Sequence, residues 1–382
     1  MLKVLKWIGI IILIVLVAVI AAVSIGLFVT RPSPPPENSK SAARLTDGPY
    51  EVGTHEYIWV DSTRSTPPNA EFEGTPDRTL PTRIWYPEGT DGHAPLVIYS
   101  HGFRSDNVGG AYVAEFLASH GYVVAAPRFP LSNGMAPGGS TISDVPSQPG
   151  DVSFVIDQMF ALSGDEKPFS VTLDADSIGA IGLSLGGLTT TLTTFHPEWR
   201  DARIKAAVSM AGPADVFGPD FFTTTDAAYL VISGTEDAIV PHRTNAAPMP
   251  DKLSSGGLLE IEGGTHAGFA DLMSGIPRLF GNPDELVCSV AEFGTGSHPF
   301  DGMFGGPELG LISPDEFVPA CSFELGEAIS AGRQQMIARL AIHALLESVF
   351  ADTAETRSEN EVFVTETLET DFPELTYLSA RR

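Results

Sequence analysis

The chain has 382 residues, 43% of them hydrophobic, which is enough to bury the core of one large domain. It carries 22 Lys and Arg against 48 Asp and Glu, a formal net charge of −26. A surface this acidic repels phosphate backbones, and the sequence has no basic patch interleaved with aromatic residues, so nucleic-acid binding is excluded. We interpret the charge as a contribution to solubility rather than as recognition of a cation.

The N-terminal segment is expected to lie outside the globular domain. Residues 7–29 contain no charge and would form a helix about 35 Å long, enough to cross the apolar core of a bilayer. Lys3 and Lys6 precede this run, which favours a cytoplasmic N-terminus and an extracytoplasmic domain. Residues 1–30 are therefore predicted to be a membrane anchor. A signal peptide that is cleaved before secretion is the alternative, although no A-x-A-like site ends the run.

The next stretch, residues 31–47, is polar and rich in proline. Such segments adopt extended conformations and act as semi-rigid spacers. We therefore expect this linker to hold the domain away from the membrane.

From residue 50 onward, the pattern is typical of a mostly parallel sheet with helices on both faces, in one domain at residues 48–350. Eight strands are predicted, at residues 50–60, 81–86, 96–100, 122–126, 177–182, 204–210, 227–232 and 258–261. Helices are predicted at residues 108–120, 151–162, 187–195 and 326–350. Residues 271–325, rich in Gly, Pro and Phe, are expected to form an irregular insertion, and residues 351–382 an acidic polar tail.

The most informative motif is Gly182-Leu183-Ser184-Leu185-Gly186, which lies between an apolar run and a Thr-rich helical stretch. The glycines two residues before and after Ser184 allow a sharp turn from strand to helix. Such a turn exposes the serine hydroxyl beside the amides of a helix N-terminus. Because the motif alone is weak in a chain with 38 glycines, its interpretation as a nucleophile rather than a turn serine depends on partner residues.

Candidate partners follow Ser184 in chain order. The run at residues 227–232 leads to Asp237, and the run at residues 258–261 leads to His266. Nucleophile, acid and histidine appear in this order in α/β-hydrolases. We expect Ser184 to attack, His266 to accept its proton, and Asp237 to orient the imidazole and stabilise the imidazolium.

Other residues could take two of these roles. Glu236 or Asp215 is the alternative acid, because each also follows a predicted strand. His242 or His298 is the alternative base, because both lie in predicted loops.

Upstream, the predicted strand at residues 96–100 leads into His101-Gly102-Phe103. An amide just past a strand end can face the oxygen of a bound acyl group. The backbone amides of Phe103 and Leu185 are therefore expected to form an oxyanion hole. His101 is expected to be a structural hydrogen-bonding residue rather than a catalyst.

Six segments resemble those of a known family. They are Thr82-Arg83-Ile84-Trp85-Tyr86-Pro87, Ser100-His101-Gly102-Phe103, Gln148-Pro149-Gly150-Asp151-Val152-Ser153-Phe154, Gly182-Leu183-Ser184-Leu185-Gly186-Gly187, Gly234-Thr235-Glu236-Asp237 and Gly263-Gly264-Thr265-His266. Over about residues 48–350 the chain is similar to the α/β-hydrolases grouped with platelet-activating-factor acetylhydrolases and predicted dienelactone hydrolases. Bacterial polyester hydrolases are more distant relatives. The resemblance implies an α/β-hydrolase fold and serine esterase activity.

Two departures narrow what the resemblance implies. True dienelactone hydrolases are expected to use a cysteine nucleophile, so Ser184 argues against that reaction. Polyester hydrolases are expected to carry a tryptophan after the sixth strand, where this chain has Pro213-Ala214-Asp215-Val216-Phe217. That difference argues against a polymer substrate.

Cys288 and Cys321 are the only cysteines, and both lie in the predicted insertion. If the domain is exported, an oxidising compartment permits a disulfide between them, closing a loop of roughly 33 residues. Two unrelated reduced thiols are the alternative.

The function expected from these features is hydrolysis of carboxylic esters with short-to-medium acyl chains, with small-molecule or lipid esters, phospholipid-type esters among them, as substrates. An acyltransferase with the same triad, or a non-catalytic binding module, is the alternative. The sequence has no metal-ligand spacing, phosphate-binding glycine loop or dinucleotide fingerprint, so no metal and no cofactor are predicted. It does not define an oligomeric state.

Overall fold

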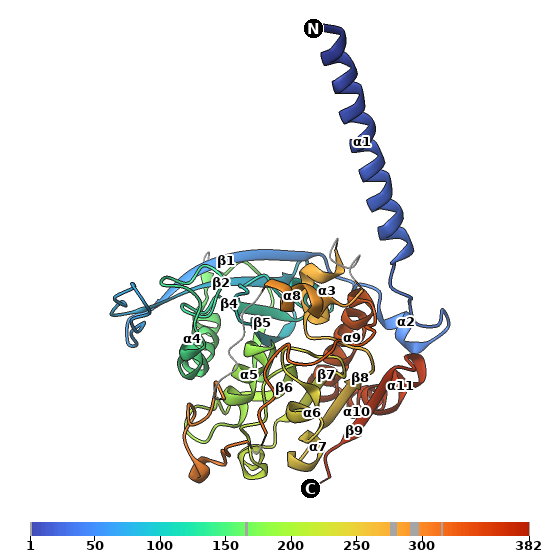
Figure 1. The fold of residues 1–382 in the computed structure, drawn as a ribbon. Coiled ribbons are helices and arrows are strands. Elements are labelled where there is room, and N and C mark those ends of the chain that lie inside the picture. The colour runs from blue at the N-terminus through green and yellow to red at the C-terminus, as the bar shows by residue number, and fades with distance from the viewer. Residues whose placement is uncertain (1, 165–166, 276–280, 291–297, 315, 382) are drawn as a thin grey trace.

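The computed structural model describes residues 2–164, 167–275, 281–290, 298–314 and 316–381, and Figure 1 shows its fold. One mixed sheet has the strand order β1-β2-β4-β3-β5-β6-β7-β8-β9. The strands are β1 (Val52–Asp61), β2 (Arg78–Pro87), β3 (His93–Ser100), β4 (Val123–Pro127), β5 (Thr172–Leu183), β6 (Ile204–Met210), β7 (Ala228–Gly234), β8 (Gly257–Ile261) and β9 (Leu375–Ser379). Strands β3 to β8 pair in parallel, whereas β1, β2 and β9 pair antiparallel.

Helices cover both faces of this sheet (Figure 1). The helices of the domain are α3 (Ala111–Ser119), α4 (Gln148–Ala161), α5 (Leu185–Phe195), α6 (His242–Asn245), α7 (Met249–Lys252), α8 (Pro283–Val290), α9 (Ala331–Phe350), α10 (Ala354–Val362) and α11 (Leu368–Asp371). Short 3₁₀ turns lie at Ile142–Ser147, Pro219–Thr223, Ala267–Phe269, Asp271–Ser274 and Pro307–Leu309, and a π-helix at Phe363–Thr367.

The central strands are apolar on both sides because each side meets a helical layer. Within β3, Leu96 and Ile98 pack in the cluster that contains the apolar residues of α4 and α5. Val97 and Tyr99 point the other way, into the cluster that contains those of α3 and α9. This alternation follows from the two-residue period of a strand. The predicted mostly parallel sheet covered by helices on both faces is therefore confirmed.

A ninth strand corrects the predicted count of eight, and it comes from the segment predicted to be a tail. Residues 354–379 form α10, the π-helix, α11 and β9, and β9 pairs with β8. Phe363, Leu368 and Phe372 are fully or almost fully buried in the cluster that contains the apolar residues of α9. The prediction of a polar tail is wrong because the acidic residues that dominate its composition lie among a few well-placed apolar ones.

The linker is also attached to the domain rather than free. Arg333 Nη1 donates to the carbonyl oxygens of Ser33 (2.7 Å) and Pro34 (3.3 Å). The Ser41 amide, in α2 (Lys40–Arg44), donates to Asp371 (3.0 Å). The linker thus packs on the domain at these residues, and its role in holding the domain away from the membrane stays a prediction. The sequence did not reveal these contacts of the linker, because Asp371, one of the residues it contacts, lies in the segment predicted to be a tail.

The N-terminal helix α1 (Leu2–Val29) stands away from the domain (Figure 1). Its part from Lys6 to Val29 is long and apolar enough to cross a membrane, and the apolar window within it is unburied. A signal sequence passes the same test, so both localisations expected from the sequence agree with this helix.

The predicted insertion, residues 271–325, contains α8 and two of the 3₁₀ turns. Phe300, Phe304 and Leu311 are buried in the core cluster on the α4 and α5 side of the sheet. Residues 276–280, 291–297 and 315 of this segment lie outside the described residues.

Candidate active site

Ser184 lies at the turn between β5 and α5, in a backbone conformation that side chains rarely adopt (φ 57°, ψ −121°). The turn is closed so tightly that both flanking glycines are required. A Cβ on Gly182 would lie 2.1 Å from the carbonyl oxygen of Gly186, and one on Gly186 would lie 1.9 Å from that of Ser100. A strained backbone at a non-glycine residue is typical of functional positions. Here the tight turn places Ser184 at the C-terminal end of β5, where helix α5 begins.

His266 and Asp237 meet Ser184 in one line of hydrogen bonds. His266 Nε2 lies 2.8 Å from Ser184 Oγ, and His266 Nδ1 lies 2.9 Å from Asp237 Oδ2. The other carboxylate oxygen of Asp237 accepts the amides of Ile239 (2.9 Å) and Val240 (2.7 Å). The Asp237 side chain is fully buried, whereas that of His266 is 12% exposed. The structure thus brings together the three residues that the sequence singled out.

The alternative acids and bases are engaged elsewhere. Asp215 pairs with His298 (2.9 Å), and His242 pairs with Glu260 (2.7 Å). The remaining alternative, Glu236, accepts the amide of Gly326 (3.0 Å).

A second buried carboxylate, Asp284, was not found by sequence reasoning. Its Oδ2 accepts the amides of Ala238 (2.9 Å) and His266 (3.1 Å), and its Oδ1 accepts that of Ala267 (2.7 Å). Asp284 therefore joins the loop that carries the acid to the loop that carries the histidine. Asn282 and Pro283 are a helix-start signal that could have revealed α8, but nothing in the sequence indicated where Asp284 points.

The charges around His266 shift its pKa upward. Burial alone would lower the pKa of His266, but the hydrogen-bonded carboxylate of Asp237 opposes this effect, and Asp284 adds to the opposition. Burial and the nearby Asp237 carboxylate raise the pKa of Asp284. The site is therefore arranged to stabilise an imidazolium.

The disulfide between Cys288 and Cys321 lies close to this network. It is formed with a Cα–Cα distance of 5.7 Å, and Cys288 is on α8, the helix that carries Asp284. The amide of Cys321 donates to the carbonyl oxygen of Ala238 (2.7 Å), next to Asp237. The bridge thus ties two parts of the insertion to the loop of the acid.

The Gly102–Phe103 peptide lies beside Ser184, since a Cβ on Gly102 would lie 3.3 Å from Ser184 Cβ. Within the described chain, neither the Phe103 amide nor the Leu185 amide donates to a protein acceptor. Two unused amides next to a serine hydroxyl can receive a negatively charged oxygen.

His101 orients this peptide. Its Nε2 accepts the amide of Phe129 (3.1 Å), so its proton is on Nδ1, which donates to the carbonyl of Gly102 (2.8 Å). Because carbonyl and amide point in opposite directions in a trans peptide, this bond also sets the direction of the Phe103 N–H. Burial lowers the pKa of His101 to about 4 and keeps the ring neutral. The structural role expected for His101 agrees with these contacts.

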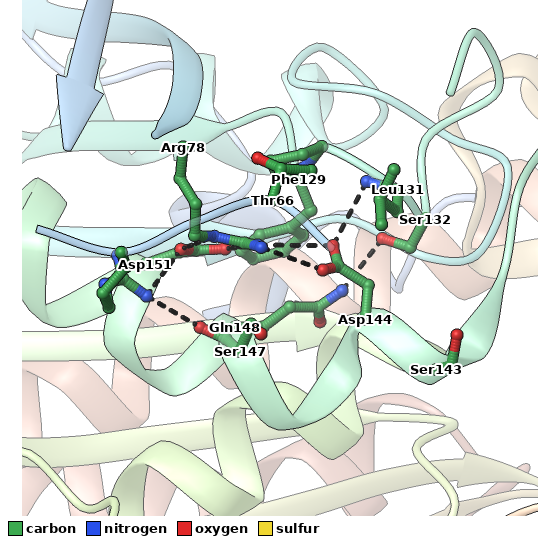
Figure 2. Close-up of polar contacts among 12 residues, drawn as sticks. Thr66, Arg78, Phe129, Leu131, Ser132, Ser143, Asp144, Ser147, Gln148 and Asp151 are labelled. Atoms are coloured by element: carbon green, nitrogen blue, oxygen red, sulfur yellow. Dashed lines mark hydrogen bonds and ion pairs between the residues drawn. The ribbon is translucent and has the colours of Figure 1, made fainter. Parts of the chain in front are cut away.

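A buried ionic cluster holds the loop on the other side of the site (Figure 2). The guanidinium of Arg78, on β2, bonds to Asp151 (2.6 and 2.7 Å) and to Asp144 (3.1 Å). Asp144 accepts the amide of Leu131 (3.1 Å), and Gln148 donates to Ser132 (2.9 Å). A buried charge is stable only when oppositely charged and hydrogen-bonding groups surround it. Through Asp144 and Gln148 the cluster also fixes residues 131–132, which directly precede lining residues 133–135 of the cleft.

A cleft of about 470 Å³ is lined by segments that flank the site. Residues 103–106, 108–109 and 133–135 line it together with Arg128 and with residues 270–273, which follow the His266 turn. Ser184 is adjacent to these lining residues, since a Cβ on Gly102, which precedes the lining residue Phe103, would lie 3.3 Å from Ser184 Cβ. The walls combine apolar side chains with charges of both signs, as in many sites for small molecules.

Among the described residues, no group of three or more His, Cys, Asp or Glu side chains is placed to hold a metal ion. The expectation that the protein uses no metal or cofactor stays a prediction.

Comparisons with known proteins place the chain in a family. The model of the family described as PETase, PET hydrolase-like, matches residues 77–277, more than half of the chain. The fold resembles that of a ferulic acid esterase from Streptomyces cinnamoneus, with a TM-score of 0.52 and 18% identity over 86% of this chain and 97% of that one. No curated protein matches the sequence.

The sequence resemblance named polyester hydrolases as the more distant relatives, and the family whose model matches is PET hydrolase-like. The closer resemblance to platelet-activating-factor acetylhydrolases and dienelactone hydrolases stays a prediction. The matched family and the sequence resemblance both indicate the α/β-hydrolase fold. The chain belongs to the PET hydrolase-like family and is a carboxylic ester hydrolase.

Proposed function

We propose that the protein cleaves carboxylic esters through an acyl-enzyme formed on Ser184, with His266 as general base and acid and Asp237 as the residue that orients it. The observation that carries this proposal is the unbroken line from Ser184 Oγ through His266 to Asp237, with distances of 2.8 and 2.9 Å. A serine hydroxyl is a weak nucleophile at neutral pH, and a hydrogen-bonded imidazole is the group that activates it.

In the first half of the reaction, Ser184 Oγ attacks the ester carbonyl carbon while His266 Nε2 takes the hydroxyl proton. The negative charge that develops on the carbonyl oxygen is received by the amides of Phe103 and Leu185, each worth roughly 3 to 4 kcal/mol in comparable sites. When the C–O bond to the alcohol breaks, His266 gives its proton to the leaving oxygen. The acyl group then remains on Ser184.

In the second half, water attacks the acyl-enzyme and His266 accepts a proton from it. Collapse of the intermediate breaks the bond to Ser184 Oγ, which regains the proton, and the carboxylic acid is released. Asp237 keeps the proton of the imidazole on Nδ1, so that Nε2 is free to accept in both halves.

The proposed substrates are esters with short-to-medium acyl chains. The cleft is open and of modest volume, about 470 Å³. Polyester hydrolases are expected to carry a tryptophan after β6. At this place the present chain has the buried residues Ala214, Val216 and Phe217. We therefore favour small esters over polymers.

A series of p-nitrophenyl esters of increasing chain length tests the proposal, with Ser184→Ala as the control. Acetyl to hexanoyl esters should be hydrolysed faster than long-chain esters, and Ser184→Ala should abolish turnover. A preference for chains beyond about twelve carbons would contradict the proposed acyl specificity.

We further propose that α1 anchors the protein in a membrane with the catalytic domain on the extracytoplasmic side. The support is the apolar segment from Lys6 to Val29 and the lysines that precede its uncharged part. Intact protein should stay in the membrane fraction after alkaline carbonate extraction. Soluble protein whose first residue lies beyond residue 22 would indicate a cleaved signal instead.

A further inference from the structure

The connection between α1 and the domain is very short. Thr30 and Arg31 still contact the last turn of α1, which ends at Val29. Pro32 already lies against the first turn of α9, because a Cβ on Gly332 would come within 2.8 Å of its ring. Three residues span at most about 10 Å, so the end of α1 lies within about that distance of Pro32, the residue that packs against the first turn of α9.

Arg333 fixes this connection. Its Nη1 donates to the carbonyl oxygens of Ser33 and Pro34, while its Nε and Nη2 face the carboxylate of Glu374. The guanidinium also lies 4.8 Å from the ring centre of Phe372. Since both ends of the guanidinium have partners, the segment that follows α1 is held against the domain.

The same turn of α9 supports the segment that carries the catalytic histidine. Ala331 packs with Ala267 and Met273 in one apolar cluster. The side-chain amide of Gln334 bonds to both backbone groups of Thr265, at 3.0 and 2.7 Å. The anchor therefore reaches the domain next to the wall of the cleft that contains Met273, and Figure 1 shows α1 rising on the side where α3 and α8 lie.

The rim of the cleft on this side is apolar and exposed. Leu272 is 73% exposed, and Phe103, Val108 and Met135 are exposed as well. All four line the same cleft, so they form one patch, which we call the rim patch. Exposed apolar side chains that gather around a binding cleft mark a surface that contacts an apolar partner.

We propose that the rim patch rests on the surface of the lipid bilayer that holds α1, so that the cleft opens toward the membrane. This inference rests on the proposed ester hydrolysis and specifies its substrate class: esters with a short acyl group whose alcohol part is held in the bilayer. The short connection selects the membrane as the occupant, because it keeps the rim patch beside the point where α1 leaves the domain.

The test of this orientation uses the full chain in phosphatidylcholine vesicles. Both native cysteines are in the disulfide, so a single introduced cysteine can be labelled selectively with the fluorophore NBD. Leu272→Cys and Val108→Cys report on the rim patch. Ile312→Cys is the matched control, because Ile312 and Val108 are both 43% exposed. Ile312 follows Leu311, which packs on the other face of the sheet from α9.

Lipids that carry a nitroxide on the headgroup should cause a loss of NBD fluorescence at positions 272 and 108 and leave position 312 unchanged. Equal fluorescence with and without nitroxide at all three positions would overturn the proposal. Equal quenching at all three would overturn it as well, since the domain would then have no fixed orientation. This readout needs no catalytic activity, so it stays informative if the proposed ester hydrolysis is wrong.

A kinetic comparison tests the substrate class. A flexible Gly-Ser segment inserted between Arg31 and Pro32 should lower the rate on hexadecyl acetate in phosphatidylcholine vesicles and leave the rate on dissolved p-nitrophenyl acetate unchanged. An unchanged rate on both esters would contradict the role of the short connection. Absence of activity on both esters in the unmodified protein would instead contradict the proposed function.

Discussion

At the scale of residues, the site depends on where a few buried charges are placed. Asp237 has no exposure, and its carboxylate is used completely by His266 and two backbone amides. Asp284 accepts three amides from the loops on either side of it. A buried carboxylate that is satisfied in this way both orients its donors and adds negative charge beside the imidazole.

Asp237→Asn should lower kcat by on the order of 10⁴ with little change in folding, because the amide no longer holds the imidazole in the required tautomer. The matched control is Asp215→Asn, which changes the carboxylate that pairs with His298. Kinetics of both variants on one p-nitrophenyl ester check this prediction. A larger loss in Asp215→Asn would mean that the acid has been misassigned.

The pH profile tests the contribution of Asp284. Only neutral His266 can act as base, and its raised pKa places the acidic limb of kcat/KM above the ordinary value of about 6.5. Asp284→Asn removes a negative charge that stabilises the imidazolium, so the pKa of His266 should fall and the limb should move to lower pH.

Glu236→Gln is the control for this shift. Glu236 precedes Asp237 and also accepts a backbone amide, but its donor is Gly326 and not a residue of the His266 loop. Its profile should match that of the unmodified protein. A limb at the same pH in Asp284→Asn would show that Asp284 has no electrostatic effect on His266.

At the scale of elements, α8 is the part of the insertion that matters most for the site. It carries Asp284 and one half of the disulfide, and it packs near the turn that follows His266 through Leu286 and Val287. A helix of eight residues has little stability of its own, so its position depends on these tertiary contacts.

Replacing both cysteines, Cys288→Ser and Cys321→Ser, should lower the free energy of unfolding by roughly 3 to 4 kcal/mol in the chain-entropy model of disulfide stabilisation. The closed loop has a sequence separation of 33 residues. Denaturant unfolding of the variant beside the unmodified protein measures the difference. Equal stabilities would mean that the bridge contributes nothing to the folded state.

The C-terminal segment should be essential for stability. Phe372→Ala should lower the free energy of unfolding by about 3 to 5 kcal/mol, because its ring is fully buried and the surrounding core cannot fill the cavity. Val362→Ala in the same segment is the control, since Val362 is exposed. Similar small effects in both variants would restore the view of this segment as a dispensable tail.

The sequence predicted the elements with strong local signals. The strands of the parallel sheet were visible as apolar runs, and the elbow at Ser184 was visible because both glycines are needed there. Strand β9 was missed because its pairing with β8 joins segments more than a hundred residues apart. Asp284 was missed because its three amide donors lie 17, 18 and 46 residues away along the chain, and only the fold brings them together.

At the scale of the whole molecule, the chain is one three-layer domain with an apolar helix that projects from it and is joined to it by a short connection. The N-terminal linker, α9 and the C-terminal segment contact one another through Arg333, Glu374 and Asp371. These contacts fix the segment that follows the apolar helix to α9, the helix that also supports the residue before His266. The acidic net charge of −26 favours solubility of the domain.

The central claim is that Ser184 is a nucleophile activated by His266. A fluorophosphonate probe tests it most directly, because an activated serine attacks the phosphorus and keeps a stable adduct. Peptide mass spectrometry of the labelled protein should find the adduct on Ser184, and both Ser184→Ala and His266→Ala should lose the label together with ester turnover. Folded protein that takes no label and hydrolyses no ester, or a label on a different serine, would contradict the account.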